Sequence, residues 1–379
     1  MVKDDAQLLE LMLVDQQRAA PIFQPTNYWK NYVDVVLSEL RRDGLRGFRA
    51  REGSYMASFG ATDAGVHWRV LLDNRRLNNL RMRRLPGFVP LVTWLDRVVT
   101  ETIGQRLLHG AMVYGLSATQ VERELEQRAA ERAAALGREA GARPLAQLSI
   151  SLEGEPKHVF HLDGKPMTMS LLNYYIRYAY VHRFFDFANA SLVVELGSGS
   201  GKQVEVVSKL HPNICYFLFD IPPQLYVCEQ FLKAVLGERV VSYGECRSMS
   251  DLPSPVAGKV FLFGNWQFPK LEKARVDLFW NAASLQEMEP DVVEMYLTTV
   301  DKSAQAVYLN ETMSGMAKAS RAGRPGVLNQ TMLAHYERFL PSFRRVDMRP
   351  AEAPLWVHEG FSDTYWIRRD SERRTRVVQ

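Results

Sequence analysis

The stretch that decides the fold is Val193-Val194-Glu195-Leu196-Gly197-Ser198-Gly199-Ser200-Gly201. An apolar strand leads directly into three glycines at alternate positions, and a helix follows with Val204, Val207 and Leu210 on one face. Glycine lets the backbone turn tightly and approach a ligand closely, because it has no Cβ. The N-terminus of the following helix offers free N–H groups to an anionic group. The stretch therefore predicts a ligand-binding turn between a strand and a helix.

Two better-known glycine motifs do not fit this turn. A dinucleotide fingerprint would require glycine at 202, where the chain has Lys202. A phosphate-binding P-loop would require glycine at 196, and Ser or Thr in place of Gln203. The pattern that remains is E-x-G-x-G-x-G.

A second strand supports a nucleoside site. Tyr216-Phe217-Leu218-Phe219-Asp220 is an apolar run that ends in an acid, and only the helix after Gly201 separates it from the glycine turn. An acid at the tip of this strand is placed to accept hydrogen bonds from both ribose hydroxyls. Together, the turn and this strand resemble motif I and its partner acid in class I S-adenosylmethionine-dependent methyltransferases.

That resemblance assigns a cofactor, S-adenosylmethionine, and its contacts. It implies that the glycines make room for the methionine part, that Glu195 binds its ammonium group and that Asp220 binds the ribose. Ile221 would pack on the adenine, and a tyrosine in the helix before the first strand could reach the carboxylate, although aromatic core packing is an equal alternative. The predicted cofactor-binding residues are Glu195, Gly197, Ser198, Gly199, Gly201, Asp220, Ile221, Asn281, Tyr174 and Tyr178.

Strand-length apolar runs recur after residue 150, and helical segments separate most of them. The runs are Leu192–Leu196, Cys215–Phe219, Val260–Phe263, Val276–Trp280 and Ala306–Leu309. This alternation predicts an α/β fold, a Rossmann-like parallel sheet of the class I methyltransferase type with helices on both faces. Either Val240–Tyr243 or Val260–Phe263 could be the third strand. Phe343–Met348 and Thr364–Arg369 predict a closing antiparallel pair.

The chain has 379 residues, enough for one large or two unequal domains. Before residue 150 the pattern is mainly helical, with a helix from about Tyr28 to Leu40 that stops at Asp43-Gly44. The segment 120–140, rich in Glu, Arg and Ala, predicts a solvent-exposed helix. We therefore predict a helical N-terminal domain over 1–150, which serves as substrate lid or dimer interface, and a cofactor-binding catalytic domain over 151–379.

Charge and composition narrow the class of protein. The net charge of +4 does not suggest a dedicated nucleic-acid binder. It conceals an arginine-rich segment, 41–106, which has 13 Arg, no Lys and six acids. This segment is either a basic outer face or a surface for an anionic substrate or partner. The three cysteines match no disulfide or metal pattern, and no signal peptide or membrane span is evident, so we expect a soluble, cytoplasmic protein.

Further motifs resemble the putative sugar O-methyltransferase family. They are Asp277–Met288, Asn310-Glu311, Tyr28-Trp29, Gly44–Arg49 and the Asp220-Ile221-Pro222 step. The resemblance extends roughly from Tyr28 to Asn310 and is looser over 50–160. Ile221-Pro222-Pro223 departs from the usual Leu-Pro-Glu, and Glu311 follows the asparagine. These departures leave the acceptor open.

Transfer of a methyl group to a hydroxyl requires a general base, placed beside the cofactor at the ends of the strands. Glu287 fits best by position, with Glu311 and His335 as further candidates and a structural role as the alternative for each. Gln286, Asn310 and His358 are the candidates for holding the substrate. No spacing of acids is diagnostic of a metal, so we predict none.

The sequence thus favours an O-methyltransferase that acts on a sugar or a small natural-product intermediate. The alternative is a non-methylating enzyme on the same scaffold, which catalyses an intramolecular displacement or cyclisation. A nucleic-acid methyltransferase is disfavoured, because Asn281-Ala282-Ala283-Ser284 stands where an Asn/Asp-Pro-Pro-aromatic step would be. We expect a small-molecule substrate and no nucleic-acid or membrane partner, and a homodimer is an open alternative to a monomer.

Overall fold

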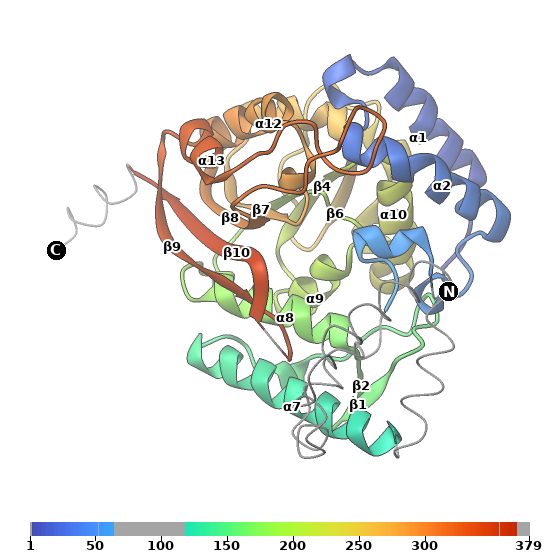
Figure 1. The fold of residues 1–379 in the computed structure, drawn as a ribbon, viewed down its shortest axis with the longest axis vertical. Coiled ribbons are helices and arrows are strands. Elements are labelled where there is room, and N and C mark those ends of the chain that lie inside the picture. Colours follow the sequence, from blue (N-terminus) through green and yellow to red (C-terminus); the bar gives the residue numbers. More distant parts are fainter. Residues whose placement is uncertain (1, 52, 64–117, 356, 370–379) are drawn as a thin grey trace, which may run out of the picture.

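One large sheet organises the chain in the computed structural model, which describes residues 2–51, 53–63, 118–355 and 357–369 (Figure 1). Within these residues its strand order is β5-β6-β4-β3-β7-β8-β10-β9. The strands are β3 (Leu192–Leu196), β4 (Cys215–Asp220), β5 (Val240–Val241), β6 (Val260–Gly264), β7 (Val276–Ala282), β8 (Ala304–Thr312), β9 (Phe343–Glu352) and β10 (Val357–Arg368).

The first six strands in that order are parallel, and β10 lies antiparallel between β8 and β9. The closing antiparallel pair predicted from the sequence is therefore present. The open question of the third strand is also settled, because β6 pairs directly with β4 while β5 is a short edge strand. This is the predicted Rossmann-like α/β sheet, parallel apart from its closing antiparallel pair.

Alternate side chains of the sheet enter two hydrophobic clusters. On β4, Tyr216 and Leu218 belong to one cluster, whereas Phe217 and Phe219 belong to the other. The first face is covered by α8 (Met169–His182), α9 (Lys202–Leu210) and α10 (Pro222–Leu236). The second is covered by α11 (Tyr243–Cys246), α12 (Pro290–Ser303) and α13 (Leu333–Phe339). Both faces are buried, which explains the continuously apolar strand sequences.

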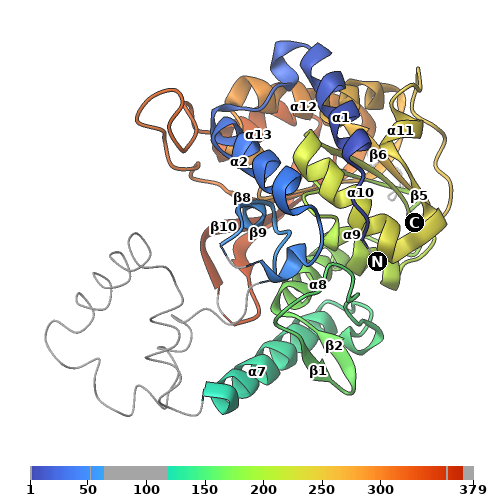
Figure 2. The same cartoon turned by 90° about the vertical axis from the view of Figure 1, so that its right-hand side faces the viewer.

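The N-terminal helices join the cluster on the first face. Leu9 of α1 (Ala6–Arg18) and Val36 of α2 (Asn27–Asp43) are buried there with the α10 side chains. Figure 2 shows α1 and α2 beside α10, and α7 (Ala118–Glu139) beside α8 and the β1–β2 hairpin (Phe160–Leu162, Lys165–Met167). The described N-terminal residues thus share a core with the sheet, and the domain boundary at about 150 stays a prediction.

The helix predicted over 120–140 forms as α7, but it is not simply an exposed helix. Ala129 and Ala133 are fully buried, and a Cβ at Gly137 would lie 2.0 Å from the Tyr175 hydroxyl. Small side chains let α7 approach α8 closely. A helix with almost no large apolar residues can therefore still pack into the core through its alanine face.

Short 3-10 segments complete the described chain: η1 (Pro21–Phe23), η2 (Phe48–Ala50), η3 (Tyr55–Phe59), η6 (Leu145–Gln147), η7 (Gly237–Arg239), η8 (Asn265–Lys273) and η9 (Leu285–Glu287). Among the described residues, no helix is both long and apolar enough to cross a bilayer. In the same part of the chain, no group of three or more His, Cys, Asp or Glu side chains is placed to hold a metal ion.

Candidate active site

The glycine-rich turn after β3 is held in place by close contacts on two sides. Gly197 (φ 74°) and Gly199 (φ 55°) both adopt left-handed backbone conformations. A Cβ at Gly197 would lie 2.2 Å from the Ser284 hydroxyl, and one at Gly199 would lie 2.6 Å from the carbonyl oxygen of Phe59. Any larger residue would therefore push apart the turn and the segments that pack against it.

The third glycine of the motif has a different neighbour. Gly201 caps the N-terminus of α9, and a Cβ there would lie 2.9 Å from Leu232 Cγ and 3.0 Å from Cys228 Sγ. It packs the turn against α10 and is absent from the lining of the cavity described below. Its smallness serves helix packing in this structure.

The acid at the tip of β4 is tied to the turn. Asp220 Oδ2 accepts a hydrogen bond from the Gly199 N–H at 2.8 Å, and Oδ1 accepts one from the Ile221 N–H at 2.8 Å. Burial raises the pKa of Asp220 to about 7, although both N–H groups oppose that rise. The carboxyl group thus joins the end of β4 to the glycine turn after β3.

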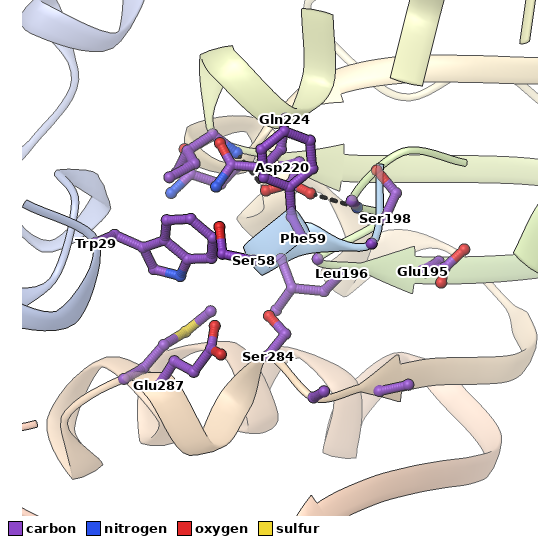
Figure 3. A pocket seen from close by; sticks show the side chains of 18 of the residues that line it. Trp29, Ser58, Phe59, Glu195, Leu196, Ser198, Asp220, Gln224, Ser284 and Glu287 are labelled. Carbon is purple, nitrogen blue, oxygen red and sulfur yellow. Dashed lines mark hydrogen bonds between the residues drawn. The ribbon is translucent and has the colours of Figure 1, made fainter. Parts of the chain in front are cut away.

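A cavity of about 310 Å³ opens at the carboxyl ends of β3, β4, β6 and β7. Figure 3 shows its lining, with Asp220 at the end of β4, Ser198 in the glycine turn, and Trp29 and Phe59 from the N-terminal segments. Ligands of open α/β sheets bind at this edge. The predicted residues that line it are Glu195, Gly197, Ser198, Gly199, Asp220, Ile221, Tyr174 and Glu287.

The side chains of Asn281 and Glu311 hold the turn after β7 through hydrogen bonds with its backbone. Asn281 Nδ2 donates to the Leu196 carbonyl at 2.7 Å, and its Oδ1 accepts from the Leu285 N–H at 3.2 Å. Glu311, fully buried, accepts from the N–H groups of Ser284 (3.2 Å) and Gln286 (2.9 Å). Neither side chain lines the cavity.

The side chains of Gln286 and Asn310 form hydrogen bonds with other parts of the chain. Gln286 Oε1 accepts from the Thr312 N–H at 2.5 Å, and Asn310 Nδ2 donates to Asp363 Oδ1 at 2.7 Å. Both side chains are nearly inaccessible to solvent and neither lines the cavity. They hold β8 to the η9 turn and to β10.

Three further predicted residues also lie off the cavity lining. The hydroxyl of Tyr178 pairs with His211 Nε2 at 2.9 Å in the core, as the packing alternative expected. His335 Nδ1 accepts from the Met332 N–H at 3.0 Å and so caps α13. His358 lies on β10 against Phe361, and burial together with the nearby Arg177 charge lowers its pKa.

Glu287 lies at the cavity, where helix α2 holds it. Its side chain is 6% exposed and forms hydrogen bonds with the side chains of Trp29 and Tyr28. The Thr26 hydroxyl donates to the Glu287 carbonyl at 2.9 Å. Burial, and then the carboxylate of Glu311, raise the pKa of Glu287 well above its ordinary value, while the hydrogen bonds from Trp29 and Tyr28 oppose that rise.

The N-terminal segment supplies cavity residues that the sequence did not single out. Trp29 and Phe59 both line the cavity, with ring centroids 6.5 Å apart. Figure 3 shows Phe59 between Trp29 and Ser198. Tyr28-Trp29 was noticed only as a family motif, and nothing local in the sequence links either ring to a glycine turn so far along the chain.

The segment that carries Phe59 is anchored by a buried ion cluster. Asp63 Oδ2 accepts from Arg49 Nε at 2.6 Å, and Asp63 Oδ1 lies 3.1 Å from Lys202 Nζ. Burial alone would raise the pKa of Asp63, but the two cations outweigh it and lower that pKa. Burial lowers the pKa of Lys202 to about 8, and Asp63 limits the fall. Lys202, which stands where a dinucleotide fingerprint would have glycine, thus ties the glycine turn to the N-terminal segment.

The arginine-rich segment is only partly described. Arg41, Arg42, Arg49 and Arg51 each pair with an acid of this chain. The eight arginines from 69 to 106 lie outside the described residues, so a role for this segment in binding an anionic group stays a prediction.

Glu195 and Arg177 both line the cavity, and the positive charge of Arg177 acts on the Glu195 carboxyl group. Burial, and then the Asp220 carboxylate, raise the pKa of Glu195 well above its ordinary value, whereas Arg177 lowers it. Arg177 lies on α8 one turn after Tyr174, and its guanidinium is 5.7 Å from that ring. The cavity lining therefore includes an acidic and a cationic side chain whose charges interact.

Several buried polar atoms of cavity-lining residues lack partners among the described residues, and Asn265 Oδ1 and Gln224 Oε1 are two of them. The orientation of the Asn265 amide is fixed, since its Nδ2 donates to the Phe23 carbonyl and to the Tyr296 hydroxyl, each at 2.9 Å. Buried acceptors are normally satisfied, so these two atoms mark places where a ligand's donors fit.

Comparison with known proteins finds similar solved structures. No protein-family model matches the chain, and no curated protein matches it. Among solved structures, magnesium protoporphyrin IX methyltransferase (ChlM) from Synechocystis PCC 6803 with bound SAH is 10% identical, over 53% of this chain and 84% of that one, with a TM-score of 0.37. The pyocyanin biosynthetic protein PhzM is 15% identical, over 52% of this chain and 57% of its own, with a TM-score of 0.35.

The mitomycin 7-O-methyltransferase MmcR aligns over 74% of this chain and 84% of its own, with 14% identity and a TM-score of 0.34. For PhzM, by contrast, the aligned region spans little more than half of that protein's length. At this level of identity and superposition, the likenesses carry no argument about activity. The strand order and register of the chain itself identify its fold.

Proposed function

We propose that the protein is an S-adenosylmethionine-dependent methyltransferase that transfers a methyl group to a hydroxyl of a sugar or a small natural-product intermediate. The observation that carries the proposal is the bond from the Gly199 N–H to Asp220, at the mouth of a cavity on the ligand-binding edge of the sheet. The glycine turn and the strand-end acid, which the whole of α9 separates in the sequence, meet there.

The residues at the cavity suit the parts of this cofactor. Asp220 would accept from the ribose hydroxyls, and the unpartnered oxygens of Asn265 and Gln224 would accept from the adenine amino group or the ribose. Glu195 would hold the ammonium group, and Arg177 the carboxylate. Ile221 lines the same cavity, where it would pack on the base.

When bound, the cofactor supplies an electrophilic methyl group on a sulfonium, so the chain has to position the acceptor and remove its proton. Glu287 is the general base in this proposal: its carboxylate takes the proton from the acceptor hydroxyl as the oxygen attacks. The hydrogen bonds from Trp29 and Tyr28 favour its ionised form and orient it. Trp29 and Phe59 offer flat apolar faces on which an acceptor ring would pack.

In this proposal, Glu311, Asn281 and Gln286 do not contact the substrate and act by positioning Glu287. They fix the turn on which Glu287 lies, through the backbone bonds of Ser284, Leu285 and Gln286. This proposal gives His335 and His358 no chemical role, and their absence from the cavity lining supports that.

Mass spectrometry tests the proposal directly. The protein is incubated with adenosylmethionine that carries a deuterated methyl group, and with panels of nucleotide sugars, glycosides and phenols. We expect one panel member to gain the labelled methyl while an equal amount of S-adenosylhomocysteine forms. Loss of a leaving group without methyl gain would replace this function by the displacement or cyclisation alternative. No S-adenosylhomocysteine with any of the three classes would contradict the proposal for those acceptors.

A further inference from the structure

A second, small cavity lies next to the main one, and the two share Glu195 and Gln203 in their linings. Its volume is about 10 Å³, close to the space that one water molecule requires. Its lining combines apolar side chains with four polar ones: Phe187, Val193, Glu195, Gln203, Val204, Val207, Tyr216 and Trp280.

Three polar atoms in this lining lack a hydrogen-bond partner among the described residues. They are the Tyr216 hydroxyl, Trp280 Nε1 and Gln203 Oε1. Their side chains are only 2%, 2% and 6% exposed, respectively. The orientation of the Gln203 amide is fixed, because its Nε2 donates to the Tyr174 carbonyl at 3.2 Å.

The sheet register explains why these groups come together. Glu195 pairs with Trp280 on β7, and Val193 pairs with Tyr216 on β4. Side chains at alternate positions of a strand share a face, so Val193, Glu195, Tyr216 and Trp280 all point to the same side of the sheet. Gln203 reaches them from the first turn of α9.

The donors and acceptors match a single water molecule. The indole N–H can only donate, the amide oxygen can only accept, and the phenol can do either. A buried water normally makes about three hydrogen bonds to groups that would otherwise be unsatisfied. An apolar occupant would leave all three atoms unsatisfied, and the space is too small for a larger polar one.

We propose that this cavity binds one structural water, which joins Trp280, Tyr216 and Gln203 to the Glu195 carboxyl group. Hydrogen bonds from water favour an ionised carboxylate, which is the form that binds an ammonium group. The consequence for ligand binding rests on the proposed function, whereas the water itself does not. Tyr216 and Trp280 are positioning residues in this account.

The other charged and titratable groups that act on Glu195 do not bridge this cavity. They are Asp220, Arg177, Tyr174 and Cys228. Asp220 and Arg177 line only the main cavity. In this proposal, the water is the partner of Glu195 on the side of the small cavity.

The first test is a crystal structure of the ligand-free protein at a resolution that shows ordered waters. We expect one water within hydrogen-bond distance of Trp280 Nε1, the Tyr216 hydroxyl and Gln203 Oε1. An empty cavity, or direct contact of the Glu195 carboxyl with Trp280 Nε1, would overturn the proposal. This result is independent of whether the protein is a methyltransferase.

The second test measures binding of S-adenosylhomocysteine by calorimetry at pH values below and above neutrality. Tyr216→Phe should weaken binding roughly 2- to 10-fold, more at the lower pH, because one hydrogen bond that favours the ionised form is lost. Tyr365→Phe, which removes a buried hydroxyl elsewhere on the same side of the sheet, is the matched control. Equal affinities of the two variants at both pH values would contradict the positioning role. No binding by the wild type would instead refute the proposed function.

Discussion

Glu287 combines burial with two hydrogen bonds from helix α2, and these act on its pKa in opposite directions. Burial and Glu311 raise its pKa, while Trp29 and Tyr28 oppose the rise. A general base contributes most when its pKa lies near the working pH. Sequence position alone selected this residue, and the structure adds the partners that orient it.

Glu287→Gln tests that role at the level of one atom. Turnover should fall by roughly 10²- to 10⁴-fold, because the amide cannot take the proton, while cofactor affinity stays within about 2-fold. Steady-state rates and calorimetric titration measure the two quantities. Glu289→Gln, just beyond it in the chain and bonded to the Leu328 N–H, is the control. Wild-type turnover of Glu287→Gln would remove it as the base.

The buried carboxyls of Asp220 and Glu311 make stability depend on pH. Burial raises each pKa to about 7, from ordinary values of 3.8 and 4.5. Between those values and pH 7, the folded chain keeps protons that the unfolded chain has lost. The free energy of unfolding of the ligand-free protein should therefore fall as pH rises through this window.

Thermal melting between about pH 5 and pH 7.5 measures this dependence. Asp220→Asn and Glu311→Gln should each flatten the slope, since an amide does not titrate. The exposed Glu272→Gln should leave the slope unchanged. A melting temperature that rises with pH across the window would show that these two carboxyls do not dominate the linkage.

At the scale of elements, the glycine turn depends on its neighbours as much as on its own backbone. Gly197 and Gly199 meet Ser284 and Phe59, which come from the β7 turn and the N-terminal segment. The turn, the helix after it and the strand-end acid could all be predicted, because they depend on residues close in sequence. The contacts that close the turn could not, because they join segments that are far apart in the chain.

Gly199→Ala separates the two contributions. Left-handed backbone strain costs about 1–2 kcal/mol for alanine, and the clash with the Phe59 carbonyl should add roughly 1–3 kcal/mol. Gly164→Ala is the control, since Gly164 has φ 76° and nothing within 4 Å of an added Cβ. Urea unfolding gives both losses. Equal losses would mean that the N-terminal segment does not pack on the turn.

At the scale of the whole molecule, the N-terminal segments complete the cavity. The sequence divided the chain near residue 150 and proposed a lid. In the described residues, α2 and η3 supply Trp29 and Phe59 to the cavity, and Asp63 joins Arg49 to Lys202 beneath them. The sequence could not predict this, because a buried ion pair between distant residues leaves no local pattern.

Asp63→Asn tests this attachment. Without the carboxylate, two buried cations lack their partner, and the expected loss of stability is roughly 3–5 kcal/mol. The exposed pair of Asp251 with Lys273 is the comparison, and Asp251→Asn should cost less than about 1 kcal/mol. Chemical unfolding of both variants measures the difference. Similar small losses would show that the ion cluster does not hold the N-terminal segment.

Calorimetric titration with S-adenosylmethionine tests most directly whether the cavity beside Asp220 binds this compound. The wild type should bind in the micromolar range, and Asp220→Ala should weaken binding by about 10-fold or more, since hydrogen bonds to an ionised group are lost. Asp277→Ala is the matched control. The Asp277 carboxylate also accepts backbone hydrogen bonds, from the N–H groups of Ser191 and Leu192, but at the amino-terminal ends of the strands, opposite the cavity. It should bind like the wild type. No binding by the wild type, or equal affinity in Asp220→Ala, would contradict the account.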